Sequence, residues 1–337
     1  MPHDNASLIR VAAQEGSELG VDDARALFAA ILAGEVAPHE LEQILAASER
    51  RRASLAELTG FMRALDAHSS RLEVPHGGPR PILLPAYHGT RRQANLTALV
   101  ALLLQRYQVP VLVHGIDGEA GLNNPGRRRV EEGVSDRDFA APDGPTGHRV
   151  TTADVLCELG IEPATSLADA QSRLRHGKVA YVPVALLAPG LGRLFAPPTQ
   201  DSLPTIAHSL ALLINPFAGD GYRVIGAPSA VDLAAMREFL LASRTDALLF
   251  LGTEGEPYAD PRRQTRFEHV AAGVVTSCAD AEGEGIEREP SLPASSDAPT
   301  TAAWIANVLA GTEPVPPPLI MQLGCCLAGA RRQGAAA

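Results

Sequence analysis

Hydrophobic positions recur at helical spacing through the first part of the chain. Between residues 24 and 33 apolar side chains lie three or four positions apart, which predicts an amphipathic helix. We expect this helix to have Asp22 as its N-cap and to end at Gly34. Pro38 is expected to open a second helix, and Ser54 to cap a third with apolar residues on one face.

The pattern of apolar and polar residues changes after a short Pro/Gly-rich segment. We interpret residues 1–73 as an all-helical domain, which a later helical segment can join, and residues 74–81 as a linker. Residues 82–337 alternate short apolar runs with helical stretches, which is typical of an α/β domain with parallel strands. Residues 116–149 are rich in Gly, Pro and charge, so we expect a long insert loop there. The apolar runs cover 82–84, 96–107, 109–113, 179–184, 206–213, 222–225, 233–243 and 247–251.

The overall charge and its distribution point in different directions. The net charge of −10 argues against a nucleic-acid partner. However, no acidic residue lies between Glu73 and Asp117 or between Asp169 and Asp201, and both windows contain Arg. One explanation is chance spacing of exposed arginines. The other is a local anion-binding face whose affinity falls steeply with salt.

The cysteines form no CxxC pair and no metal-type cluster, and two of them are adjacent at Cys325 and Cys326. We interpret that pair as small buried hydrophobic side chains, with redox activity as the alternative. The first sixteen residues lack a basic segment followed by an apolar core, and no apolar run approaches the roughly 18 residues of a membrane-spanning helix. These features predict a cytoplasmic chain with reduced thiols and no membrane contact.

The most informative segment is PAYHGTRRQANLT, residues 85–97, which follows a short strand and opens an apolar helix. A turn in this position presents backbone N–H groups to an anion, aided by the helix dipole. Arg91 and Arg92 supply charge, while Asn95 and Thr97 are expected to form hydrogen bonds at the helix start. The segment is neither a Walker A loop nor G-x-G-x-x-G, so by itself it specifies no reaction.

In context, the chain resembles the anthranilate phosphoribosyltransferase family (glycosyltransferase family 3) from about residue 19 to residue 330. The segments that carry the resemblance are Gly34–Glu35, 55–65 (LAELTGFMRAL), Val113–Gly115, Ala153–Leu156 with Leu159–Gly160, Ala188–Pro189 and Asn215–Pro216. The resemblance implies a small N-terminal all-helical domain plus a larger α/β domain with a mostly parallel central sheet, as in class IV phosphoribosyltransferases and nucleoside phosphorylases. It also implies a homodimer through the helical domain. Leu27, Ile31 and Phe61 are candidates for that interface, with packing inside the chain as the alternative.

Several positions where that family binds its substrates differ in this chain. The glycine-rich loop GTGGDG, which in the family cradles the pyrophosphate of phosphoribosyl pyrophosphate, reads YHGTRRQ over residues 87–93. The family's HPAMK segment reads PPTQ at 197–200, and its anthranilate-contacting Arg is Pro204. Its magnesium-binding Asp-Glu pair is replaced by TEGE at 253–256. We therefore expect no cofactor; magnesium at Glu254 and Glu256 is expected only if phosphoribosyl pyrophosphate is still bound.

Residues 85–97, 252–263 and 308–333 resemble the YbiB-type branch of the family. That resemblance implies a homodimer without anthranilate phosphoribosyltransferase activity that binds DNA or RNA non-specifically. We expect backbone phosphates to lie in an Arg-lined cleft on which the two acid-free windows converge, with Tyr87 and Tyr258 stacking on bases. The predicted binding residues are Tyr87, His88, Gly89, Thr90, Arg91, Arg92, Gln93, Asn95, Thr97, His114, Arg173, Arg175, Lys178, Arg193, Arg262 and Arg263.

Two other functions remain open at this point. An active phosphoribosyl- or glycosyltransferase with a different acceptor would hold the phosphate end of its donor with Arg91 and Arg92. A nucleotide sensor would use the same groups without turnover. His88 and His114 are the candidates for a general acid or base, and a structural role is the alternative for both.

Overall fold

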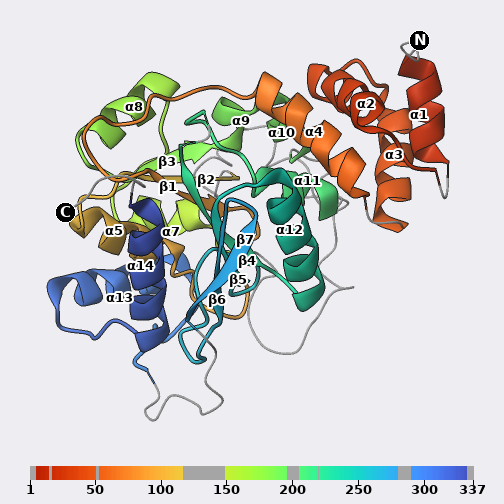
Figure 1. Ribbon diagram of the computed structural model, residues 1–337. Helices are drawn as coiled ribbons and strands as arrows, with labels where there is room; N and C mark the ends of the chain where they lie inside the picture. Colours follow the sequence, from red (N-terminus) through yellow and green to blue (C-terminus); the bar gives the residue numbers. More distant parts are fainter. Residues whose placement is uncertain are drawn as a thin grey trace, which may run out of the picture.

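The computed structural model describes residues 5–14, 17–50, 53–116, 149–195, 205–218, 220–279 and 290–331. At its centre is a seven-stranded sheet in the order β3-β2-β1-β4-β5-β6-β7 (Figure 1). The first five strands in that order are parallel, and β6 and β7 are antiparallel. The expected α/β fold with a mostly parallel sheet is confirmed. The strands are β1 (Ile82–Ala86), β2 (Val111–Gly115), β3 (Ala180–Pro183), β4 (Tyr222–Ala227), β5 (Ala247–Leu251), β6 (Phe267–Ala271) and β7 (Val274–Ala279).

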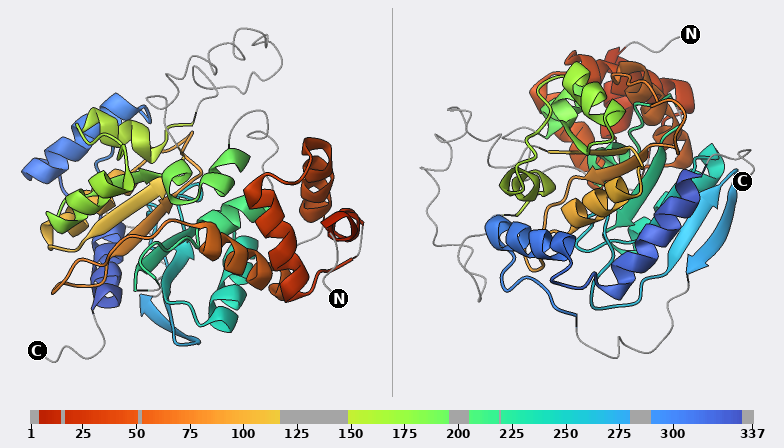
Figure 2. Two further views of the ribbon diagram at one scale, coloured as in Figure 1. Left: turned by 90° about the horizontal axis from the view of Figure 1, so that it is seen from above. Right: turned by 90° about the vertical axis from the view of Figure 1, so that its left-hand side faces the viewer.

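The central strands are buried on both faces, which explains their continuous apolar runs. Leu83 and Leu112 belong to the core on one face, whereas Ile82 and Val111 belong to the core on the other. One face is covered by α5 (Thr97–Arg106), α7 (Thr152–Glu158), α13 (Ala298–Ala310) and α14 (Pro317–Ala330). The other is covered mainly by α8 (Leu167–Arg175), α9 (Val184–Leu187), α10 (Pro189–Leu194), α11 (Thr205–Ala211) and α12 (Ala230–Ser243) (Figure 2). No helix within these described ranges is long and apolar enough to cross a membrane.

The N-terminal helices lie together at one side of the sheet domain (Figure 1). They are α1 (Asn5–Ala13), α2 (Val21–Ala33), α3 (Pro38–Arg50) and α4 (Leu55–His68). Gly34 ends α2 in the left-handed conformation, and Ser54 caps α4 in a capping box with Glu57, as the sequence predicts. The prediction of Asp22 as N-cap is wrong. Gly20 is the N-cap, and Asp22 lies in the first turn, where its carboxylate favours the positive end of the helix dipole.

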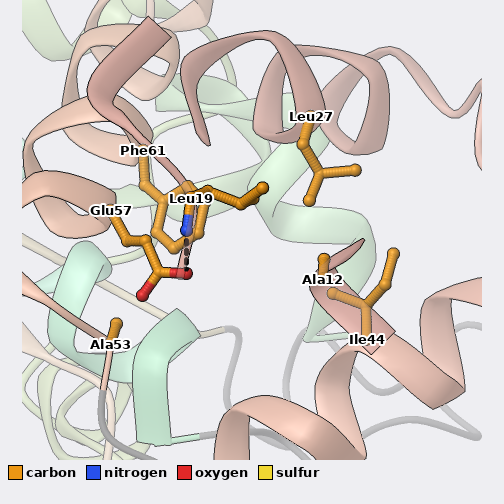
Figure 3. A pocket seen from close by; sticks show the side chains of 7 residues that line it. All are labelled: Ala12, Leu19, Leu27, Ile44, Ala53, Glu57 and Phe61. Atoms are coloured by element: carbon orange, nitrogen blue, oxygen red, sulfur yellow. Dashed lines mark hydrogen bonds between the residues drawn. The ribbon is translucent and has the colours of Figure 1, made fainter. Parts of the chain in front are cut away.

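A small apolar pocket lies among these helices (Figure 3). Glu57 is fully buried in its wall and accepts a hydrogen bond from the Leu19 N–H at 3.1 Å. Leu27 and Phe61 line the same pocket, and Ile31 is buried nearby in the same core. These three residues were candidates for a dimer face, but packing inside the chain already buries them. A homodimer through the helical domain stays a prediction.

The helical domain contacts the rest of the chain through backbone as well as side chains. Gly190 in α10 lies so close to α2 that an added Cβ would sit 2.4 Å from the Leu32 carbonyl oxygen. The Arg193 guanidinium donates to that same oxygen. Arg193 therefore caps the carbonyl end of α2, which is a favourable position for a cation. The domain boundaries at 73 and 82 stay a prediction, and the insert 116–149 lies outside the described residues except for Ile116 and Arg149.

The expectation of fully reduced cysteines is wrong. Cys278 on the edge strand β7 forms a disulfide with Cys325 on α14. Cys325 is buried, as predicted, but its sulfur is covalently paired, whereas Cys157 and Cys326 are free thiols. The pairing was invisible in the sequence because its partners are 47 residues apart and meet only when α14 packs beside the hairpin.

Reducing this disulfide should lower the free energy of unfolding by about 2–4 kcal/mol. The bond closes a long loop and so reduces the conformational entropy of the unfolded chain. Urea unfolding with and without dithiothreitol measures the effect. The matched control is Cys278→Ser, whose stability should not respond to dithiothreitol. Equal stability of the wild-type protein in both conditions would show that the bond contributes nothing.

Candidate anion-binding site

The segment singled out by the sequence lies at the carboxyl edge of the parallel strands. Residues 87–97 follow β1, and residues 252–258 follow β5, with β4 between the two strands. The strand order reverses between β1 and β4, which is where ligands bind in open α/β sheets. The turn after β5 folds back over the strand ends because Gly226 and Gly252 have no side chain. A Cβ at either position would lie within 2.3 Å of the Glu256 carbonyl oxygen.

The carboxylate of Glu256 lies at the centre of this site and is fully buried. Its Oε1 accepts from the backbone N–H of His88 at 2.9 Å and of Gly89 at 2.8 Å. Its Oε2 accepts from the side chains of Thr152 at 3.0 Å, Thr97 at 3.3 Å and Asn95 at 3.5 Å. Burial raises the pKa of Glu256, and the hydrogen bonds from Gly89, Thr152 and His88 oppose that shift.

The neighbouring carboxylate of Glu254 takes the next three backbone donors of the same loop. Its Oε2 accepts from the Arg91 N–H at 3.0 Å, and its Oε1 accepts from the N–H groups of Arg92 at 2.9 Å and Gln93 at 3.0 Å. The loop does present convergent N–H groups, as the sequence predicts. However, two carboxylates of the same chain already accept hydrogen bonds from these N–H groups. The loop therefore has the geometry of an anion-binding nest, and Glu254 and Glu256 occupy the place of the anion.

The far side of the loop is held by the residues that open α7. Thr90 and Val150 exchange two backbone hydrogen bonds, of 2.9 and 2.8 Å. The Arg149 guanidinium donates to the carbonyl oxygens of His88 at 3.2 Å and Gly89 at 3.1 Å. Burial and the nearby charge of Arg91 lower the pKa of Arg149, whereas Glu254 and Glu256 raise it. The N–H groups of the loop backbone thus donate to carboxylates, and the carbonyl oxygens of His88 and Gly89 accept from a guanidinium.

Four arginines lie on the exposed surface of this edge, and we call them the arginine cluster: Arg91, Arg92, Arg262 and Arg263. Arg262 is tied to the loop by a hydrogen bond from its guanidinium to the Gln93 side-chain oxygen at 3.4 Å. Within the described residues none of the four guanidinium groups forms an ion pair. Among the described residues, no carboxylate therefore neutralises these four charges in an ion pair.

The second basic window does not converge on this site as a whole. Arg173, Arg175 and Lys178 precede β3, so they lie at the amino edge of the sheet, opposite to the loop. Arg173 pairs with Asp169 at 2.7 Å, and Arg175 pairs with Glu73. The predicted convergence is wrong for these three residues. They lie at the amino ends of the parallel strands and the loop lies at the carboxyl ends, so the length of a strand separates them. Arg193 follows β3 but contacts α2, as described above.

The two tyrosines proposed to stack on bases are both buried. Tyr87 is 1% exposed, with its hydroxyl 2.8 Å from His114 Nδ1, and Tyr258 is 0% exposed and donates to the Ala94 carbonyl at 2.8 Å. A stacking platform needs an exposed ring face. The prediction of stacking is therefore corrected for both rings, which serve as core residues.

The two candidate acid–base histidines are held neutral by their surroundings. Burial lowers the pKa of His114 to about 3, with a further contribution from Arg223. Burial also lowers the pKa of His88 to about 3, and the nearby His208 and Arg149 act in the same direction. A general acid or base works best with a pKa near the operating pH. This arrangement favours the structural interpretation for both residues.

The carboxylates of Glu254 and Glu256 do not fit a magnesium site. All four of their oxygens accept hydrogen bonds from N–H or O–H groups, and the Arg149 guanidinium lies beside them. Magnesium would need lone pairs that face it from several directions, with waters completing an octahedron. No cluster of three or more potential metal-ligating residues occurs in the described ranges either.

The loop was visible in the sequence, but the residues packed around it were not. Asn95 behaves as predicted, since its side-chain oxygen accepts from the Thr97 N–H at 3.2 Å at the start of α5. Thr152 and Arg149 were missed as parts of the site, although both flank the quoted Ala153–Leu156 segment. Glu254 and Glu256 were considered only as metal ligands; their role as acceptors for the loop was missed.

Comparison with known proteins places this chain in a family. No family model matches the chain. The uncharacterized protein YbiB of Escherichia coli K12 is 33% identical over 314 residues, which cover 92% of this chain and 88% of YbiB. The anthranilate phosphoribosyltransferase of Pelotomaculum thermopropionicum is 26% identical over 231 residues, 67% of this chain and 57% of that enzyme.

Solved structures agree on the fold. Anthranilate phosphoribosyltransferase from Thermus thermophilus superposes with a TM-score of 0.68 at 20% identity, covering 96% of this chain and 88% of that one. The Saccharomyces cerevisiae enzyme in complex with PRPP and Mg gives a TM-score of 0.66 at 13% identity, covering 97% and 89%. Together with the similarity to YbiB, these results show that the chain belongs to the anthranilate phosphoribosyltransferase-like family.

Proposed function

We propose that this protein binds nucleic acid through backbone phosphates and transfers no phosphoribosyl group. The arginine cluster at the carboxyl edge of the sheet carries this proposal. Four exposed guanidinium groups without ion-pair partners in the described part of the chain suit a repeating polyanion better than a single small ligand. Because Tyr87 and Tyr258 are buried, recognition rests on phosphates and carries no base preference.

The state of the loop supports the loss of transferase activity. In the related enzymes the corresponding loop is expected to cradle pyrophosphate, but here Glu254 and Glu256 occupy its N–H groups. A carboxylate at this place repels a pyrophosphate and competes for the same donors. We therefore expect phosphoribosyl pyrophosphate with magnesium to bind only weakly in a calorimetric titration, and we expect no phosphoribosyl transfer to an acceptor.

Binding to an acidic protein has to be short-ranged. The chain carries a net charge of −10, so its long-range field repels DNA and RNA, and only contacts near the arginine cluster are attractive. We expect the affinity for oligonucleotides to be moderate and to fall steeply between 0.05 and 0.2 M salt, by about a factor of 10 or more for every few phosphates contacted.

The decisive experiment measures fluorescence anisotropy of a labelled single-stranded oligonucleotide at several salt concentrations. Arg91→Ala/Arg92→Ala should weaken binding by about tenfold or more and reduce the salt slope by about 1.4, or about 0.7 for each lost phosphate contact. The matched control is Arg175→Ala/Lys178→Ala, which removes two charges at the opposite edge and should change affinity by less than about twofold. If the two double variants weakened binding equally, nucleic acid would not bind at the carboxyl edge of the sheet.

A further inference from the structure

We propose that Glu254 occupies, within the chain itself, the place of one nucleic-acid phosphate, and that a phosphate displaces its carboxylate from the loop when nucleic acid binds. This inference rests on the proposed function and adds a mechanism of self-competition to it. The ligand chemistry is a phosphate oxygen pair that accepts from the N–H groups of Arg91, Arg92 and Gln93. Inorganic pyrophosphate presents the same chemistry as a nucleic-acid backbone, so the test includes both.

The three donors of the loop converge on one place. Three successive backbone N–H groups lie 2.9–3.0 Å from the two oxygens of a single carboxylate. Such a concave arrangement of N–H groups binds anions generally, because each group directs a partial positive charge to the same point. Two of these N–H groups belong to members of the arginine cluster, Arg91 and Arg92, and the guanidinium of Arg262 is linked to the side chain of Gln93. A phosphate there would gain guanidinium contacts in addition to the N–H groups.

The two glutamates of the site differ in burial. Glu256 is fully buried, with five donors from three separate segments, so no ligand can replace it without unfolding the site. Glu254 is partly exposed, and its contacts with Arg91 and Arg92 lie at the surface. The displaceable carboxylate is thus also the one beside the exposed arginines.

The turn that carries Glu254 has an unusual backbone conformation. Glu254 has φ 51° and Gly255 has φ 86°, so two successive residues adopt the left-handed conformation, which a glutamate rarely does. Within the described residues, the buried Thr90 Oγ1 on the loop lacks a hydrogen-bond partner. Buried polar atoms are normally paired. The closed arrangement is therefore incompletely satisfied, and the carboxylate contacts of Glu254 help to hold it.

The test uses Glu254→Gln, which keeps the shape of the side chain and removes its charge. If a phosphate competes with this carboxylate, the variant should bind a single-stranded oligonucleotide about tenfold more tightly than the wild-type protein at equal salt. The control is Glu238→Gln on α12, an exposed glutamate away from the site, which changes the net charge equally and should alter affinity by less than about twofold. Glu254→Ala should behave like Glu254→Gln, and circular dichroism checks that every variant is folded.

A second arm uses inorganic pyrophosphate as a competitor. It should displace the oligonucleotide from Glu254→Gln at a concentration about tenfold lower than from the wild-type protein. If Arg91→Ala/Arg92→Ala abolishes oligonucleotide binding but folded Glu254→Gln binds no more tightly than Glu238→Gln, displacement is refuted while the proposed function stands. If no variant binds oligonucleotide but isothermal calorimetry shows that Glu254→Gln alone binds pyrophosphate, nucleic-acid binding is refuted and only the latent anion site remains.

Discussion

Replacing Glu256 with alanine should lower the free energy of unfolding by about 3–5 kcal/mol, because several buried donors lose their acceptor at once. Two are backbone N–H groups, from His88 and Gly89, and the others are side chains of the 95–97 segment and Thr152. Urea unfolding followed by circular dichroism at neutral pH measures the loss.

The size of the loss in Glu256→Gln separates hydrogen bonding from charge. Glutamine keeps an oxygen for the N–H groups of His88 and Gly89, and the hydroxyls of Thr97 and Thr152 can rotate to accept from its amide. We expect Glu256→Gln to cost about half as much as Glu256→Ala or less. A loss below about 1 kcal/mol for the alanine variant would mean that water satisfies the donors and that Glu256 does not organise the site.

Acidification from pH 6.5 to pH 5 should lower the free energy of unfolding by about 3 kcal/mol through His88 and His114. In the folded chain the pKa values of His88 and His114 are about 3, whereas an unfolded histidine titrates near 6.5. Between these pH values the unfolded chain binds protons that the folded chain does not. The stability contributed by these two histidines is therefore complete above about pH 7.5, and below about pH 6 it falls by about 1.4 kcal/mol per pH unit for each histidine as the pH drops toward 3.

The variant His114→Asn isolates the contribution of one histidine. Asparagine retains an acceptor near the Tyr87 hydroxyl but does not titrate. The variant should therefore lose about 2 kcal/mol less stability than the wild-type protein over the same pH range. The raised pKa of Glu256 acts in the opposite direction, favouring the folded state as the pH falls, and it cancels in this difference. Identical pH dependence in the two proteins would show that His114 does not stay neutral.

Local patterns were sufficient for several elements of this fold. Gly34, Pro38 and Ser54 mark helix boundaries through backbone conformation and capping, and these effects act within one turn of the chain. The buried parallel strands were visible as short apolar runs. The β6–β7 hairpin was missed because its strands are short and β6 includes polar residues, Glu268 and His269, directly after a basic segment.

The candidate site was less accessible because its contacts are distant in sequence. Glu254 and Glu256 lie more than 155 residues from the loop that they complete, and only the placement of β4 between β1 and β5 brings the two segments together. The separation of Arg173 and Arg175 from the loop was in principle predictable. Both residues precede a predicted strand, and residues before a parallel strand lie at its amino end.

The contact of α10 with α2 affects how the molecule can move. Gly190 packs directly on the backbone at Leu32, and Arg193 donates to the same carbonyl oxygen. A hinge between two domains needs a linker whose backbone rotates freely. Here the contact between α10 and α2 joins the helical domain to the sheet domain in addition to the linker. Any rotation of the helical domain must therefore carry α10 and the end of β3 with it. A displacement that begins among the N-terminal helices would thus be transmitted to the carboxyl edge of the sheet.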